Sequence, residues 1–234
     1  MMHCNFILDM IMRLQPFTVL YFVLFAVGGS HAQPSEKFIR AMETRVPLID
    51  SNNQKADEWK DLGNSFERIA EAEKTQWLPF YYAALCQVRA AYALLPPGGG
   101  MGDNTAITDP LAEKAEQLVR RAEALQPGHT DIHCLWKMVH GLRMMGNPMQ
   151  RFMTEGARAA QALEKARALD PSNPRIYILE AQDKFFTPEA FGGSKKEARR
   201  LFEKADSLFR VSKTASAIEP RWGVPQVRYF LSQL

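Results

Sequence analysis

The sequence predicts an all-α fold, a right-handed superhelical stack of antiparallel helix pairs with about three repeats and one C-terminal helix. Three observations lead to this prediction. Apolar residues recur at three- and four-residue steps along most of the chain, one amphipathic motif recurs, and Pro, Gly and capping residues separate the helical segments. Sustained alternation of apolar and polar residues, which would predict strands, does not occur.

The first 32 residues differ from the rest of the chain, and we expect them to be a signal peptide. The apolar run FTVLYFVLFAVGG is followed by small residues at Ser30 and Ala32, the two positions that an exporting peptidase reads. This run is too short to span a bilayer, which takes about 20 apolar residues. Cleavage after Ala32 would release a periplasmic protein that starts at Gln33. The alternative is an uncleaved anchor.

The mature chain is expected to divide into two parts. Residues 33–55 should form an N-terminal helix and a linker, and residues 56–234 a helical repeat domain. At the start of this domain, Trp59, Leu62 and Phe66 lie three and four residues apart, which places their side chains on one face of a helix.

The next segments are a buried helix and a loop. The run from Trp77 to Leu95 is apolar on almost every side, so we expect a helix packed between neighbours. Residues 96–110, which are rich in Pro and Gly, are predicted to be a flexible loop. Asp109 and Pro110 would supply the N-cap and the first-turn proline of the helix that follows.

Two later helices have their own signals. Ser194 and Glu197 form a capping box, which predicts a helix that starts at Lys195. The glycines that follow Phe191 should adopt left-handed backbone conformations, with the Phe191 ring packed across the loop. A last short helix, Pro225 to Leu234, is expected to end the stack.

The recurring motif is Ala-x-x-x-apolar-x-x-Ala. Its three copies are Ala115/Val119/Ala122, Ala159/Leu163/Ala166 and Ala198/Phe202/Ala205. Small residues at the first and third sites let two helices approach closely, while the larger residue between them wedges into the gap. One helix pair of this kind cannot bury its own apolar face, so the copies must stack.

These residues resemble the tetratricopeptide repeat, a two-helix unit that stacks into a right-handed superhelix. The second-helix signature of that family is met by the three alanine copies, and the likeness covers residues 56–209. Its first-helix signature, Trp-x-x-Leu-Gly-x-x-aromatic, is met by Trp59, Leu62, Gly63 and Phe66.

The spacing of the copies departs from that family. They lie 44 residues apart (Ala115 to Ala159) and 39 residues apart (Ala159 to Ala198), against about 34 in the tetratricopeptide repeat. We attribute the excess to GNPMQRFMTE and TPEAFGGS, which we expect to be loops between the helices of a pair.

A second resemblance bears on the cellular location of the protein. The combination of FERIAEAEKTQWLPFYYAALCQV with FFTPEAFGG is similar to exported, uncharacterised repeat proteins of Bacteroidetes-type bacteria. This likeness implies a periplasmic location and no particular activity.

The tetratricopeptide family binds an extended peptide or a partner helix in a concave groove lined by its first helices. The resemblance therefore implies a non-enzymatic periplasmic scaffold for a protein or peptide partner of the cell envelope. Polar side chains in the groove would hold a peptide backbone or carboxylate through hydrogen bonds, and Met138 with Ile178 would supply an apolar floor. The residues that helical geometry places in this groove are Asp57, Lys60, Asn64, Asp131, Met138, Arg175, Ile178 and Gln182.

A hypothesis of another class remains open at this point. The protein would then be a small-ligand carrier or an enzyme accessory of the envelope, with a pocket between the loop PPGGGMGDN and the groove. Ligand-dependent thermal stabilisation without a protein partner would favour it.

Catalytic and metal-binding patterns are not found in the sequence. It contains no nucleophile elbow, zinc-protease helix, CxxC pair or Ser-Lys arrangement, so we expect neither an enzyme nor a cofactor. His129 and His133 are four residues apart and could share a metal, but no second cluster supplies further ligands, so no metal site is expected. Cys86 and Cys134 could form a disulfide in an exported protein, although two buried thiols are favoured.

Charge gives little information about partners. The 29 basic and 26 acidic side chains leave a net charge of +3, and the two signs are mixed along the chain. Such a balance does not indicate a nucleic-acid partner.

Overall fold

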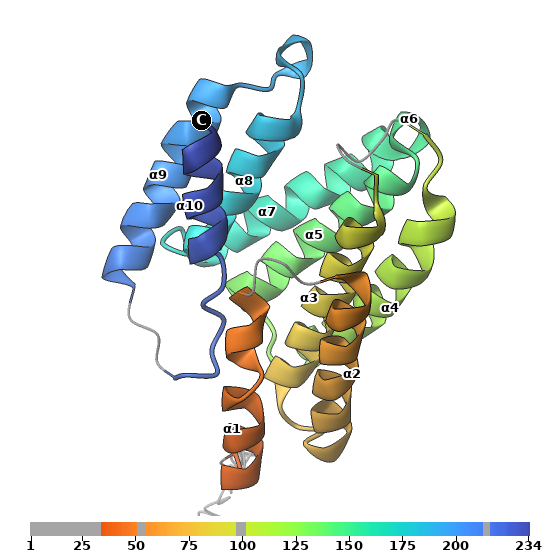
Figure 1. Ribbon diagram of the computed structural model, residues 1–234, viewed down its shortest axis with the longest axis vertical. Coiled ribbons are helices and arrows are strands. Elements are labelled where there is room, and N and C mark those ends of the chain that lie inside the picture. Colours follow the sequence, from red (N-terminus) through yellow and green to blue (C-terminus); the bar gives the residue numbers. More distant parts are fainter. Residues whose placement is uncertain (1–33, 51–54, 97–101, 213–215) are drawn as a thin grey trace, which may run out of the picture. The chain divides into compact units, whose positions relative to one another are not determined.

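The computed structural model describes residues 34–50, 55–96, 102–212 and 216–234, and within these residues it contains helices and no strand (Figure 1). The all-α prediction is therefore confirmed. The expected signal peptide and the residue after its cleavage site lie outside the described residues. None of the described helices is long and apolar enough to cross a membrane.

The helical elements follow one another closely along the chain. In order they are α1 (Glu36–Glu43), η1 (Val46–Asp50), α2 (Ala56–Ala72), α3 (Trp77–Leu94), α4 (Thr105–Leu125), α5 (Thr130–Gly146), α6 (Pro148–Arg151), η2 (Phe152–Gly156), α7 (Ala157–Leu169), α8 (Pro174–Phe186), η3 (Glu189–Phe191), α9 (Lys195–Val211) and α10 (Val224–Gln233).

Helix α9 starts where its capping signal predicts. It begins at Lys195, and the Ser194 hydroxyl accepts a hydrogen bond from the Glu197 backbone amide at 3.2 Å. The return half of the capping box is replaced, because the Glu197 carboxylate accepts hydrogen bonds from the Arg200 side chain instead. The last helix, α10, is also confirmed to within one residue at each end.

The expected flexible loop at residues 96–110 is wrong in its second half. Helix α4 begins at Thr105, and Pro110 lies inside it. The start is fixed by Asp103, whose carboxylate accepts hydrogen bonds from the Thr105 backbone amide at 2.9 Å and from the Thr105 hydroxyl at 2.6 Å. Asp109 is not the cap, since its carboxylate pairs with Arg151. Residues 97–101 lie outside the described part of the chain.

The segment GNPMQRFMTE, expected to be a loop, is helical. Asn147 caps α6 by accepting a hydrogen bond from the Gln150 backbone amide at 3.3 Å, and Pro148 occupies the first turn, where its missing N–H is not needed. The chain then widens into the π-helical turn η2 before α7. Such turns are rare and occur frequently at functional sites.

The recurring alanine motif packs inward as expected. Every residue of its three copies on α4, α7 and α9 is buried. On α2, Gly63 permits a close crossing, because a Cβ at this position would lie only 3.1 Å from Cys86 Cβ of α3. Helices α2 to α5 and α7 pack in succession, and α3 contacts α5, which contacts α8.

Two hydrophobic clusters result from this packing. The larger one joins α1, η1, α2 to α5 and α7 with Ile176 and Leu179 of α8, and it includes Ile218 and Trp222 from the stretch before α10. The smaller one joins α8, α9 and α10, which lie together in Figure 1. Tyr177 on α8 packs against both clusters. The two clusters therefore meet different faces of α8, since Ile176 and Leu179 belong to the larger one and Ile178 and Ala181 to the smaller one.

Candidate functional site

The stretch between α9 and α10 crosses helices that are distant in sequence. We call Ser216–Gly223 the closing segment. The Tyr82 hydroxyl of α3 donates a hydrogen bond to the Ile218 carbonyl at 3.0 Å, and Arg175 Nη2 of α8 donates one to the Pro220 carbonyl at 2.7 Å. Side chains of α3 and α8 thus hold this segment, which consists largely of turns and bends, by its backbone.

Trp222 anchors the closing segment in the core. Its side chain is buried, and its indole N–H donates a hydrogen bond to the Tyr81 hydroxyl at 2.7 Å. The guanidinium carbons of Arg89 and Arg175 lie 5.4 and 5.6 Å from the centroid of the indole ring. These distances allow cation–π attraction to both guanidinium groups.

Gly223 ends the closing segment in a conformation that other residues avoid. Its φ is 120°, and a Cβ at this position would lie 2.5 Å from Ile178 Cδ1. The Gly223 backbone amide donates a hydrogen bond to Asp50 Oδ1 at 3.0 Å. Glycine is required here both by the backbone angle and by the close approach to α8.

A buried ion pair lies beneath this segment. Arg175 donates hydrogen bonds to both carboxylate oxygens of Asp131, and Asn173 Nδ2 donates another to Asp131 at 2.9 Å. Burial favours the neutral form of Arg175, but the Asp131 charge outweighs it and raises the pKa of the guanidinium. Burial also raises the pKa of the nearby Tyr81 hydroxyl well above its ordinary value. Both groups of the ion pair therefore have their hydrogen bonds within the protein.

Four of the predicted groove residues are not available to a partner. Asp131, Met138, Arg175 and Ile178 are buried, so the expectation that they line an open groove is wrong in this structure. Both Arg175 and Ile178 meet the closing segment, Arg175 at the Pro220 carbonyl and Ile178 at Gly223. Arg175, which was predicted to hold the backbone of a bound peptide, holds the Pro220 carbonyl of the chain itself.

The other predicted groove residues are not buried with these four. Lys60 and Asn64 lie on α2, which packs against α1 and α3 and has no extensive contact with α8 within the described residues. Asn64 is exposed, and Lys60 Nζ lies 3.5 Å from the exposed Asp57 carboxylate. Gln182 is half-buried on α8. The structure thus separates the predicted set into four buried residues, three residues on α2 and the half-buried Gln182.

Several large apolar side chains are exposed, and two sets of them lie on or next to short segments of the chain. The first, which we call the apolar turn, consists of Met149, Phe152 and Met153 on α6 and η2. The second, the aromatic surface, consists of Phe186, Phe191 and Tyr229, and the exposed fractions of the six side chains lie between 58% and 81%. Phe191 was expected to pack across its loop, but it is the most exposed of the six.

The aromatic surface is built around a buried ring. The Phe230 centroid lies 5.7 Å from that of Phe186 and 5.3 Å from that of Tyr229. Beneath it, Phe230 stacks on Phe202 at 4.9 Å with an interplanar angle of 7°. Because Phe230 is fixed from below, the exposed rings at its sides have a rigid support.

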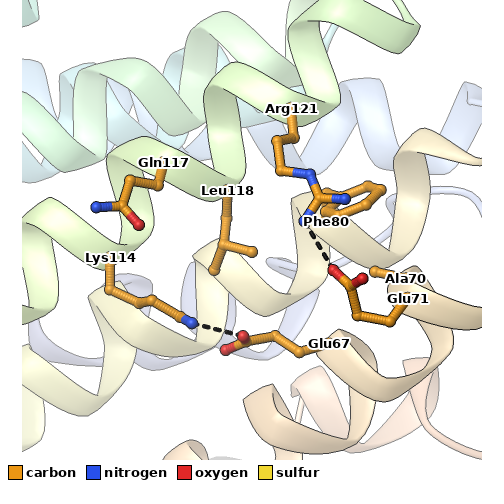
Figure 2. A pocket seen from close by; sticks show the side chains of 8 residues that line it. All are labelled: Glu67, Ala70, Glu71, Phe80, Lys114, Gln117, Leu118 and Arg121. Carbon is orange, nitrogen blue, oxygen red and sulfur yellow. Dashed lines mark hydrogen bonds and ion pairs between the residues drawn. The ribbon is translucent and has the colours of Figure 1, made fainter. Parts of the chain in front are cut away.

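The hollows on α4 are small or strongly charged. Figure 2 shows one between α2, α3 and α4, with a volume of about 140 Å³. Two ion pairs cross it, Lys114 to Glu67 at 2.6 Å and Arg121 to Glu71 at 2.8 Å, and Arg121 also lies over the ring of Phe80. Its lining residues are Glu67, Ala70, Glu71, Phe80, Lys114, Gln117, Leu118 and Arg121.

A wider hollow of about 470 Å³ lies between α4 and α5. Glu116 occupies it with two arginines, Arg120 at 2.7 Å and Arg143 at 2.6 Å. These hydrogen-bonded arginines lower the pKa of Glu116 even though its partial burial acts in the opposite direction. Neither hollow combines an apolar lining with a free charge.

Titratable side chains do not gather into a metal site within the described residues. His129 Nδ1 accepts a hydrogen bond from the Asp131 backbone amide at 3.2 Å, and His140 Nδ1 lies 2.8 Å from Glu155 Oε2. Cys86 and Cys134 are free thiols in this structure, and burial raises the pKa of each.

The chain was compared with known proteins. No protein-family model matches it, that of the tetratricopeptide repeat included, and no curated protein matches either. Among solved structures, the HusA haemophore from Porphyromonas gingivalis is similar with a TM-score of 0.70 and 33% sequence identity, over 84% of this chain and 92% of that chain.

The chain belongs to the HusA haemophore family. The all-helical fold is thus that of a protein from the Bacteroidetes, the bacterial group to which the sequence pattern pointed. It is also compatible with a stack of tetratricopeptide-like pairs, although no family model supports that finer description.

Proposed function

We propose that this protein is an exported, non-enzymatic binder of haem or a related tetrapyrrole. The observation that carries the proposal is the similarity to a haemophore at 33% identity over 92% of that protein. The proposal takes up the small-ligand hypothesis in preference to the peptide scaffold. The proposal includes export to the periplasm, with the signal peptide cleaved after Ala32.

Two features of the structure support a small apolar ligand over a peptide. The closing segment already lies across the face on which an extended peptide was expected. The apolar turn and the aromatic surface each expose three large apolar side chains, and exposed apolar surface of this kind often marks a binding site. A tetrapyrrole offers a large flat apolar face that could cover such side chains.

The finer architecture is also a proposal. We infer a right-handed stack in which α3/α4, α5/α7 and α8/α9 are the helix pairs, because α4, α7 and α9 carry the three alanine copies. Under this pairing α2 precedes the first pair, so Lys60 and Asn64 do not belong to its concave face.

Haem titration tests the proposed function. Protein expressed from its full-length gene and purified from the envelope fraction should shift the Soret absorbance of haem and show a saturable quenching of tryptophan fluorescence. Haem should also raise the melting temperature in the absence of any protein partner, since a ligand that binds only the native state stabilises it.

A soluble helical protein outside this family serves as the control for adsorption of haem. If the Soret change is not saturable, or equals that of the control, the proposal is wrong. In that case crosslinking in the envelope becomes the way to look for a protein partner.

A further inference from the structure

We propose that the aromatic surface is where the tetrapyrrole binds, with its ring face stacked on Phe186 and Tyr229 and its carboxylates paired with Lys195 and Arg228. This inference rests on the proposed function and adds the location and the chemistry of recognition. The ligand class it implies is a flat aromatic macrocycle that carries acidic side chains.

Ring geometry is the first observation that supports this location. Phe186 contacts Phe185 at 5.0 Å and Phe230 at 5.7 Å, so the exposed rings continue into a packed group of aromatic side chains. Aromatic faces attract other π-systems in addition to the apolar area that they bury. Because Phe230 is stacked from below, the surface need not rearrange to receive a flat ligand.

Charge complementarity is the second observation. Lys195 Nζ lies 5.8 Å from the Phe185 ring centroid, and Arg228 precedes Tyr229 on α10. Neither cation forms an ion pair with any residue in the described part of the chain. One unpaired cation near the packed Phe185 and another next to Tyr229 in sequence fit a ligand that is both aromatic and anionic.

The apolar turn does not combine exposed apolar side chains with unpaired cations. Its nearest arginines are already paired, Arg151 with Asp109 at 2.6 Å and Arg158 with Glu155 at 2.7 Å. A carboxylate bound there would have to displace an acidic side chain of the protein. The hollow in Figure 2 is excluded by its volume, since ligand pockets of drug size hold about 300–1,000 Å³.

Two matched double variants of the full chain test the location. Phe186→Ala/Tyr229→Ala removes the two exposed rings on which the tetrapyrrole is proposed to stack, and Phe152→Ala/Met153→Ala removes as many exposed apolar side chains from the apolar turn. We expect the first variant to bind haem at least tenfold more weakly and the second to bind as the wild type does. Metal-free protoporphyrin IX should show the same ranking, because stacking does not require iron.

A second pair of variants tests the charges. Lys195→Glu/Arg228→Glu should weaken binding of protoporphyrin IX several-fold, whereas Arg68→Glu/Lys165→Glu, which reverses two exposed cations on α2 and α7, should not. The dimethyl ester of protoporphyrin IX has no carboxylates, so its binding should be insensitive to both charge reversals. All four variants alter exposed side chains, and circular dichroism melting should confirm that each is folded.

The outcomes separate the two proposals. If the wild type binds haem and only the Phe152→Ala/Met153→Ala variant loses affinity, the location is wrong and the proposed function stands. Equal binding by all variants also overturns the location. If the wild type does not bind haem or protoporphyrin, both proposals fail together.

Discussion

The two ends of α8 differ in which side chains they bury. At the first turns, Arg175 and Ile178 are buried beneath the closing segment, and the charge of Arg175 is fully engaged. At the last turn, Phe186 is exposed although its neighbours Phe185 and Phe230 offer an apolar environment. One helix thus buries a charge at one end and leaves an apolar ring in water at the other.

This contrast indicates which end is under structural constraint and which is free for binding. Burial of a Phe side chain contributes about 1.5–3 kcal/mol, which the fold does not gain at Phe186. Burial of a charge is tolerated only when its hydrogen bonds are satisfied, as they are at Arg175. Substitutions at the closing segment should therefore change stability, and substitutions at the aromatic surface should change binding.

The largest expected effect comes from the buried ion pair. Arg175→Ala leaves the Asp131 carboxylate and the Pro220 carbonyl without their main donor, so the free energy of unfolding should fall by about 3–5 kcal/mol. Urea denaturation measures this difference, and the exposed Arg228→Ala is the control, with an expected change within about 0.5 kcal/mol.

A double variant makes this test specific. Arg175→Met/Asp131→Leu removes both charges and should cost less than Arg175→Ala alone, because no uncompensated charge is left buried. A single-variant cost below about 1 kcal/mol, the level expected for an exposed ion pair, would show that the pair is not buried in solution.

The next effect concerns the end of the closing segment. Gly223→Ala places a Cβ against Ile178 at a backbone angle that L-residues rarely adopt, so stability should fall by about 1–3 kcal/mol. Gly102→Ala is the matched control, since a Cβ there meets no atom within 4 Å. The same denaturation experiment compares the two, and equal stabilities would contradict the described path of the closing segment.

The smallest effect is a dependence on pH. Burial raises the pKa of Asp50 and of Glu219, both of which lie at the closing segment. Because the folded pKa of each acid lies above its unfolded value, the folded protein binds protons more tightly. These two groups therefore favour folding increasingly as the pH falls from neutral toward their unfolded pKa values of about 4.

The variant Asp50→Asn/Glu219→Gln isolates this contribution. At pH 7 the variant should be at least as stable as the wild type, and the wild type should gain stability relative to it as the pH is lowered to 5. Denaturation at several pH values measures the difference between the two proteins. A difference that stays constant, or grows in favour of the variant, would refute the assignment.

Local patterns were sufficient for much of the fold. The alanine copies and the Ser194 cap were predicted correctly, because helical periodicity and capping depend on residues within a few positions of one another. Where the predictions failed, the local signals were ambiguous. Asp109-Pro110 can begin a helix, but Asp103 and Arg151 start α4 earlier and use Asp109 in an ion pair.

The candidate site depended on contacts between distant parts of the chain. Periodicity predicted that Arg175 and Ile178 face a groove, but which segment covers this part of α8 could not be read from their neighbours in sequence. The closing segment reaches it from about 45 residues away, as the contact between Arg175 and Pro220 shows. The exposure of Phe186 and Phe191 likewise depends on tertiary packing, because no other part of the described chain covers these two rings. Amphipathic order is a local property of the chain, whereas burial is settled only when the helices are packed together.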